Sequence, residues 1–452
     1  MQRAEPPLLA RFAEYGARDA VRPLPAEVVR HAKRALIDWF AALYPGTRVS
    51  PAVNLVRAHA AELGVGRSSL PGFATTAFPA TAAWINGTAS HSVEFDDIYR
   101  EAVYHPGCPV ISAALALAED RGLDGAQLLA AITIGYEIST RIGAAVQPSH
   151  YKYFHTTGTA GVFGAAAAGA ALLAPGEATV MRHALATAGT FASGLQQAFR
   201  SESMTKPLHA GHAASMGVTS SMAAASGVTG AEDLLDGEAG FVAAMSDGAR
   251  WDRVLPGLGS DYNITRITFK NHGCCGHAFA ALDAALELRP DLDPNEIEAI
   301  EVESYRAALD VAGIADPQGA PDAKFSIPYL MAHALLRGSV RLDAFDEDHL
   351  RDPAIRALLK RVTVHEDPAL TANFPGKRAA RVVIKMKDGR RLEKFAPTRK
   401  GDPEAPLSDA EVEGKFLELA APVLGDARAK RLLERLWKVD TLSVRDLELA
   451  KP

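Results

Sequence analysis

Apolar residues recur at helical spacing through the first 260 or so residues of the chain. In the stretch 25–44 they return every three or four positions, and Pro25 suits a first helical turn. The same spacing predicts further helices over 51–62, 76–92, 108–119, 124–142, 157–173, 177–199, 208–226 and 231–235. Gly, Pro and Ser fill the connectors, as in GRSSLPG at 66–72. Small residues three and four apart, such as Gly161 and Gly164, predict closely approaching helix axes.

The pattern changes at about residue 264, where β-branched and alternating segments begin. ITRITF (264–269), IEAIEVESY (297–305) and VTVHE (362–366) read as strands. RVVIKMKDGRRLEKF (381–395) predicts two strands joined by a turn at Asp388-Gly389. Helices are expected between the strands, over 277–288, 326–337 and 352–360. A last helical segment begins after Ser408, which is an expected N-cap.

These patterns predict a mainly α protein of two domains. A chain of 452 residues exceeds what one hydrophobic core usually serves. We expect a large all-helical domain over 1–264 and 399–452, and a smaller α+β domain over 265–398. The C-terminal helical segment would then rejoin the first domain.

Composition and charge narrow the classes of function. Apolar residues make up 48% and charged residues 23% of the chain, which is ordinary for a soluble globular protein. A net charge of -6 gives no electrostatic reason to expect nucleic acid or an anionic membrane as a partner. Three cysteines argue against a disulfide framework, and no signal peptide or membrane span is expected. The sequence predicts a cytoplasmic protein.

Four islands of reactive side chains interrupt the helical background. They are HSVEFDDIYREAVYHPG (91–107), YKYFHTTGTAG (151–161), RSESMTKPLHAGHAA (200–214) and FKNHGCCGHAF (269–279). Three of them combine a polar loop with a following alanine-rich helix, whose N-terminus favours a carboxylate. Any one such cluster is more often a solvated or capping group than a catalytic one. The islands can form a functional site only if the fold brings them close together.

Other kinds of site fit the sequence poorly. His91, Asp96, Asp97 and His105 offer metal-ligand atoms, but no HExxH or HxxxH spacing organises them. The cysteines, Cys108 and the pair Cys274 and Cys275, are too few and badly spaced for an iron–sulfur cluster. Nucleotide-binding glycine motifs and a GxSxG elbow are missing from the sequence. We therefore expect no metal and no cofactor.

Taken together, the islands resemble the MmgE/PrpD family of 2-methylcitrate dehydratases, cis-aconitate decarboxylases and iminodisuccinate epimerases. The resemblance runs from about Pro25 to residue 440 and is strongest in NGTASHSVEFDD with HPG, FHTTGTAGVFGAAAAGAALL and SMTKPLHAGHAASMGV. FKNHGCCGHAFAALDAALEL, AKFSIPYLMAHALLRGSVRLDAF and GDPEAPLS add to it.

The resemblance implies a large helical domain, a smaller α+β lid, a site between them and a homodimer. It also implies enzymes that act without a cofactor on small polycarboxylates. Carried over residue by residue, the implied catalytic positions are Glu94, Asp97, His105, His155 and Lys206. Tyr329, from the FSxPY motif, is an implied substrate-binding residue, and the islands supply Arg200, His209 and His277 as further candidates.

The sequence also departs from the family pattern. The common motif Asp-Phe-Asp-Asp-Thr is here Glu94 to Ile98, so the first acid is longer and a hydroxyl is lost. The segment from Asp97 to His105 is one residue longer than in the decarboxylases, and an arginine that follows the cysteine pair is replaced by Gly276. These changes argue against assuming a methylcitrate or cis-aconitate substrate.

Three functions fit these residues. The first is a cofactor-independent lyase, a dehydratase or decarboxylase, in which Lys206 and the histidines stabilise a carbanion or enolate. Glu94 or Asp97 could then orient His105. The second is an epimerase or isomerase that uses two bases on opposite faces of one carbon. The third is a non-catalytic protein that binds small acids on a retired enzyme fold.

Overall fold

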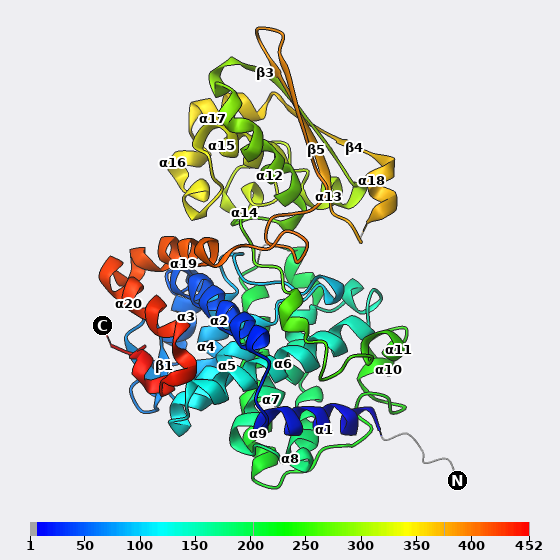
Figure 1. Cartoon of the computed structure of the whole chain (residues 1–452), viewed down its shortest axis with the longest axis vertical. Helices are drawn as coiled ribbons and strands as arrows, with labels where there is room; N and C mark the ends of the chain where they lie inside the picture. Colours follow the sequence, from blue (N-terminus) through cyan, green and yellow to red (C-terminus); the bar gives the residue numbers. More distant parts are fainter. Residues whose placement is uncertain (1–6, 202, 375, 452) are drawn as a thin grey trace. The chain divides into compact units, whose positions relative to one another are not determined.

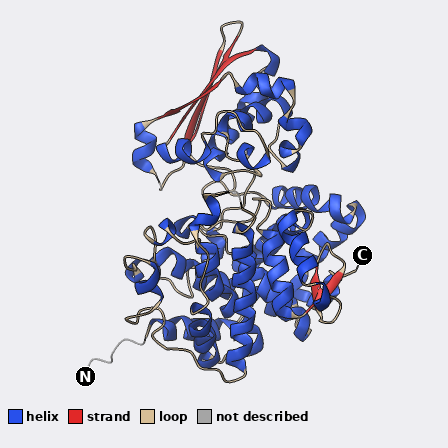
Figure 2. Ribbon diagram, turned by 180° about the vertical axis from the view of Figure 1, so that it is seen from behind, coloured by secondary structure: helices blue, strands red, loops and turns tan. Residues whose placement is uncertain are grey.

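The computed structural model describes residues 7–201, 203–374 and 376–451 as two compact units. The first unit comprises Met1–Thr268 and Ser408–Pro452, and the second comprises Phe269–Leu407. The expected domain ends, 264 and 398, lie four and nine residues before these boundaries. The C-terminal segment belongs to the first unit, and Figures 1 and 2 show the helical and the sheet-containing parts.

The first unit is built almost entirely from helices. Its helices are α1 (Leu8–Val21), α2 (Ala26–Gly46), α3 (Ser50–Ala58), α4 (Pro79–Ser90), α5 (Gly107–Arg121), α6 (Gly125–Ala145), α7 (Thr156–Leu173), α8 (Ala178–Gly189), α9 (Lys206–Ala225), α10 (Phe241–Met245), α11 (Trp251–Val254), α19 (Asp409–Leu424) and α20 (Asp426–Trp437). Capping boxes begin two of them: Asp124 starts α6, and Ser408 starts α19 as the sequence predicts.

Helix α7 is the centre of this unit and packs against α5, α6, α8 and α9. It is long and apolar enough to cross a membrane, but 94% of its apolar window is buried inside the protein. Small residues permit the packing, as the sequence predicts. A Cβ atom added to Gly164 would lie only 2.8 Å from the carbonyl oxygen of Gly135 on α6. The alanine and glycine residues therefore allow the four helices α5, α6, α8 and α9 to pack closely around α7.

Three parts of the first unit differ from the sequence prediction. The connector 66–72 contributes to a two-stranded antiparallel ribbon, β1 (Ser68–Leu70) with β2 (Thr75–Ala77), so the unit is not wholly helical. The helix expected over 177–199 ends at Gly189, and 231–235 forms turns among glycines.

ITRITF is not a strand either. The side chains of Glu137 and Thr140 accept hydrogen bonds from Asn263 and hold Asn263–Arg266 in a 3₁₀ turn. The sequence prediction was wrong here because hydrogen bonds to side chains distant in the sequence outweigh the β propensity of this segment. Within this segment Thr268 forms an isolated antiparallel bridge with Ile98.

The second unit has a four-stranded mixed sheet in the order β4-β3-β5-β6. Its strands are β3 (Ile297–Ser304), β4 (Val362–Glu366), β5 (Ala380–Met386) and β6 (Arg391–Ala396). β3 and β4 are parallel, whereas β5 runs antiparallel to both β3 and β6. The β5–β6 hairpin turns at Asp388-Gly389, where Gly389 has a φ of 89°, and this confirms the predicted turn.

Helices pack on the sheet and complete the core of the second unit. They are α12 (Phe279–Leu288), α13 (Arg306–Ala312), α14 (Ala320–Ala323), α15 (Ile327–Arg337), α16 (Glu347–Leu350), α17 (Pro353–Leu359) and α18 (Pro368–Asn373). α12 contacts β5 and β6, and α15 contacts β4 (Figure 1). The mainly helical fold with a smaller α+β part is therefore as predicted.

Candidate active site

The polar loop 91–107 joins α4 to α5 and has an unusual backbone. Glu94 and Val103 have φ values of 63° and 48°, in the left-handed region that side chains other than glycine rarely adopt. Backbone hydrogen bonds between Tyr99 and Tyr104 close a tight turn around residues 100–103. Such conformations cost free energy and cluster at functional sites, so the loop is a candidate site on backbone geometry alone.

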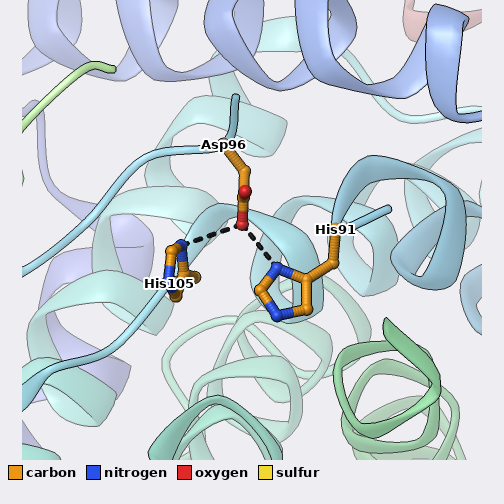
Figure 3. Close-up of side chains that lie close together, drawn as sticks. All are labelled: His91, Asp96 and His105. Atoms are coloured by element: carbon orange, nitrogen blue, oxygen red, sulfur yellow. Dashed lines mark hydrogen bonds and ion pairs between the residues drawn. The ribbon is translucent and has the colours of Figure 1, made fainter. Parts of the chain in front are cut away.

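Asp96 is the centre of a buried cluster on this loop. One of its oxygens, Oδ2, lies 2.6 Å from Nδ1 of His91 and 2.9 Å from Nδ1 of His105 (Figure 3). The thiol of Cys108 donates to the same oxygen at 3.1 Å. The carboxylate beside His105 is thus Asp96, and not Glu94 or Asp97 as the sequence suggested.

The ring of His91 is buried and has a defined orientation. Its Nδ1 faces Asp96, so the proton is expected there and the lone pair on Nε2. Nε2 is buried and has no hydrogen-bond partner among the described residues. Burial lowers the pKa of His91 although Asp96 acts in the opposite direction. His91 is therefore a neutral base with one available nitrogen.

Two more histidines extend the cluster from other helices. His155, at the N-cap of α7, stacks on His91 with ring centroids 5.4 Å apart. Its Nδ1 lies 3.1 Å from Nδ1 of His209, which stands one turn after Lys206 on α9. Gly194, at a φ of 128°, accepts a hydrogen bond from the His155 backbone at 2.9 Å. The second and third islands thus meet the first.

These two rings are also held neutral. Burial, together with the nearby His91 and Lys206, lowers the pKa of His155 well below its ordinary value. Burial is likewise the main cause that lowers the pKa of His209 to about 4. At neutral pH both histidines therefore carry no charge, and their shared N–H lies between two rings.

Lys206 supplies the positive charge at the start of α9. Its ammonium group donates to Oε1 of Glu94, and both side chains are 19% exposed. The ammonium group contributes to lowering the pKa of His91, His155 and His209. The positive charge of Lys206 that disfavours protonation of these rings would also attract a carboxylate bound beside them.

Asp97 lies in a different environment from the cluster. Its Oδ2 accepts a hydrogen bond from the Tyr136 hydroxyl at 2.7 Å, and its Oδ1 accepts one from the Gly107 backbone at 3.0 Å. Burial, and then Asp38 nearby, raises the pKa of Asp97 to about 8. Asp97 is therefore protonated at neutral pH, and both of its oxygens accept hydrogen bonds from the protein. These properties suit a residue that holds the loop in place.

The remaining predicted site residues are less closely associated. Arg200 is exposed, and its guanidinium donates to the backbone oxygen of Lys152 at 3.2 Å. In the second unit, His277 Nδ1 lies 2.8 Å from the Tyr305 hydroxyl. Tyr329 is fully buried, and its hydroxyl donates to the backbone oxygen of Ala344. Roles in substrate binding for these three residues stay predictions.

His91, Asp96 and His105 could also hold a metal ion. Their ligand atoms all lie within 4.8 Å of one another, and two imidazoles with one carboxylate are a common set for Zn²⁺ or Fe²⁺. The spacing H-x₄-D-x₈-H matches no standard metal motif, which is why sequence reasoning gave the trio little weight. The 2.6 Å contact between His91 and Asp96 is equally that of a hydrogen bond. The expected absence of a metal stays a prediction.

The chain matches two models of one family. Residues 10–254 match the MmgE/PrpD N-terminal domain, and residues 272–439 match the MmgE/PrpD C-terminal domain. Human cis-aconitate decarboxylase is 27% identical over 432 residues, which cover 92% of this chain and 88% of that protein. The cis-aconitate decarboxylase-like protein oryM of Aspergillus oryzae is 26% identical, with 92% and 91% covered.

A shorter match links the chain to dehydratases. The 2-methylcitrate dehydratase of Cupriavidus necator is 32% identical over 123 residues, which is 25% of each protein. The two domain models together span most of the sequence, and they confirm the resemblance carried by its polar islands. This chain belongs to the MmgE/PrpD family.

Proposed function

We propose that this protein is a cofactor-independent lyase that acts on a small polycarboxylate, and that decarboxylation is its reaction. The observation that carries the proposal is the meeting of Lys206 with neutral histidines of three islands. Decarboxylases also resemble 92% of the chain, whereas the dehydratase match covers 25%. Because the decarboxylases match far more of this chain than the dehydratase does, we favour loss of CO₂ over loss of water.

The chemistry needs charge stabilisation more than a strong base. When a carboxylate leaves as CO₂, the C–C bond breaks and its electron pair stays on the substrate as an enolate-like carbanion. Lys206 lies where it can exchange its ion pair with Glu94 for one with the substrate. A preorganised cation in a water-poor site stabilises that developing charge strongly.

A proton must then be added to the carbanion. His105 is the best candidate, because its side chain is 15% exposed and its Nδ1 lies 2.9 Å from the Asp96 carboxylate, which orients the ring. The deeper rings of His91 and His155 are neutral and can donate or accept hydrogen bonds that orient the substrate. Asp96 acts as a positioning residue that fixes the His91 tautomer and the His105 ring.

The substrate is expected to differ from that of the decarboxylases named above. Glu94 is one methylene longer than the aspartate common at this position, and Ile98 lacks the hydroxyl of threonine. Glu94 pairs with Lys206, so the longer acid changes the polar groups offered to a substrate there, and the change at Ile98 removes a hydroxyl from the same loop. We also propose a cytoplasmic homodimer, and light scattering of the purified protein would measure the oligomeric state.

Proton NMR in D₂O tests the proposal directly. The EDTA-treated protein is incubated with cis-aconitate, citrate, 2-methylcitrate and both enantiomers of substituted succinates. We expect a product that has lost a carboxylate, and a kcat lower by about 10²–10³-fold in Lys206→Ala. Lys430→Ala, on an exposed lysine of α20, is the control and should leave the rate unchanged.

Each other outcome has a defined meaning. A new alkene formed by loss of water would make the protein a dehydratase, and deuterium exchange without elimination would make it an epimerase. Activity that EDTA abolishes and Zn²⁺ or Fe²⁺ restores would contradict cofactor independence and assign the His91–Asp96–His105 trio to a metal. Turnover that survives Lys206→Ala would overturn the role of the lysine.

A further inference from the structure

The C-terminal part of the first unit contains a small basic cavity that the proposed reaction does not use. Its volume is about 130 Å³, and α20 and the residues that follow it form most of its wall. Arg428, Arg431, Arg435 and Lys451 line it together with one acid, Glu448. Four cations and one carboxylate leave a net of three positive charges around a space of this size.

The charges of the cavity are only partly compensated. Glu448 accepts from Arg435 at 3.0 Å and from Lys451 at 2.5 Å, so this one carboxylate is shared by two cations. Arg428 donates to the backbone oxygen of Lys451. Arg431 has no hydrogen bond or ion pair with any described residue. The positions 428, 431 and 435 place three guanidinium groups along one face of α20.

A buried hydroxyl provides a second, independent observation. Tyr44, near the end of α2, lines the same cavity and is fully buried. Its hydroxyl has no hydrogen-bond partner among the described residues, which is costly for a buried polar group. Burial raises the pKa of Tyr44, with Arg428 acting in the opposite direction, so the hydroxyl keeps its proton as a donor.

We propose that this cavity binds a small, multiply charged oxyanion, a phosphate group or a polycarboxylate. Guanidinium groups recognise both through paired, charge-assisted hydrogen bonds, and the Tyr44 hydroxyl adds a neutral donor. The apolar floor, which includes Leu432 and Leu447, lowers the local dielectric and strengthens these interactions. The site shares no residue with the histidine cluster.

Isothermal titration calorimetry of the full chain at constant ionic strength tests this site. The Lys206→Ala background removes the lysine of the candidate active site, so that citrate binding there is weakened. Inorganic phosphate and citrate are the two probes. We expect saturable binding of at least one, and an affinity at least about tenfold weaker in Arg428→Gln/Arg431→Gln, the factor for one lost charge-assisted hydrogen bond.

Two further variants separate the site from a general charge effect. Lys430→Gln removes one exposed cation of the same helix that does not line the cavity, and it should leave the affinity unchanged. Tyr44→Phe keeps every charge and should weaken binding by roughly threefold to tenfold. Binding of phosphate alone would identify a phosphate-bearing ligand, and binding of citrate alone a polycarboxylate.

The proposal has clear ways to fail. It is overturned if neither anion binds saturably, or if Lys430→Gln weakens binding as much as the double arginine variant does. Circular dichroism and the melting temperature of each variant show whether it is folded. Because Arg428 and Arg431 lie outside the histidine cluster, the double variant should keep the full turnover measured by NMR.

Discussion

Asp96 and Asp97 are neighbours in the sequence, yet they lie in opposite environments. Asp96 shares one oxygen with His91, His105 and Cys108 in the histidine cluster. Asp97 is enclosed by Tyr136 and the Gly107 backbone, close to Asp38. One side of the loop thus holds groups suited to chemistry, and the other holds groups that fix the backbone.

The supporting side reaches further than Asp97. Lys415 on α19 donates to Asp38 at 2.6 Å and to the backbone oxygen of Phe95 at 2.7 Å. Phe95 lies between Glu94 and Asp96, so a helix from the end of the chain anchors the middle of the loop. Substitutions on the Asp96 side should therefore mainly lower activity, and substitutions on the Asp97 side should mainly lower stability.

The largest expected effect is the pH dependence that Asp97 gives to stability. Its pKa in the folded protein is about 8, against an ordinary value of 3.8, so the folded state keeps a proton that the unfolded state loses. The contribution of Asp97 to the free energy of unfolding is therefore complete below about pH 4. It decreases as the pH rises towards 8, and it does not change further above pH 8. The loss accumulates to on the order of 5 kcal/mol.

Urea denaturation from pH 4 to 9 measures this dependence. Asp97→Asn cannot ionise, so the difference in unfolding free energy between this variant and the wild type should change steadily up to about pH 8 and then stop. A constant difference over the whole range would show that Asp97 is ionised in the folded protein, and the contrast with Asp96 would be lost.

The next effect comes from the buried ion pair behind the loop. Lys415 and Asp38 have side chains that are each 1% exposed. Lys415→Met takes the Lys415 ammonium group away from the buried Asp38 carboxylate, which should cost about 3–5 kcal/mol. Lys33→Met is the control from the more exposed pair with Asp440, whose side chains are 14% and 32% exposed, and it should cost less than about 1 kcal/mol.

Denaturation midpoints of three variants decide this prediction. The double variant Asp38→Leu/Lys415→Met removes both charges and should recover much of the stability that Lys415→Met loses. Equal costs for Lys415→Met and Lys33→Met would mean that the loop is not anchored through this pair.

Substitution of Asp96, on the side of the loop suited to chemistry, should change the free energy of unfolding less but should clearly lower the rate of the reaction. Asp96→Asn should lower kcat by about 10²-fold, because His91 and His105 lose the carboxylate oxygen that positions both rings. Asp97→Asn at pH 7 should leave kcat close to the wild-type value, since Asp97 is already protonated there. A similar loss in both variants would show that the two sides of the loop are not independent.

The sequence predicted the fold well where its patterns are local. The hairpin at Asp388-Gly389, the N-cap at Ser408 and the alanine-rich central helix all depend on short-range rules. ITRITF was predicted incorrectly because Asn263 bonds to Glu137 and Thr140, which are more than 120 residues away in the chain. No local pattern contains that information.

The candidate site shows the same division. The islands identified His105, His155, His209 and Lys206, since a dense polar run in an alanine-rich chain is visible in the sequence. Sequence could not tell which acid faces the cluster, because the side chains of adjacent residues diverge and the left-handed backbone at Glu94 sets their directions. His91 and Asp96 were visible as polar residues, but only the fold brings Nδ1 of both His91 and His105 to one oxygen of Asp96.

The smallest predicted effect is also the most specific test of the protonation of Asp97. Tyr136→Phe removes the hydroxyl that donates to Asp97 at 2.7 Å. A hydrogen bond to a neutral group is worth about 0.5–1.5 kcal/mol, and one to a charged group about 1.5–3 kcal/mol. The cost of Tyr136→Phe should therefore be near 1 kcal/mol at pH 6 and should rise above pH 8, where Asp97 ionises. Tyr104→Phe is the matched control, because the buried Tyr104 hydroxyl donates to the Ser139 hydroxyl at 3.1 Å and, among the described residues, to no carboxylate. Its cost should be the same at both pH values, so a Tyr136→Phe cost that is equally flat would mean that Asp97 does not change its charge over this range.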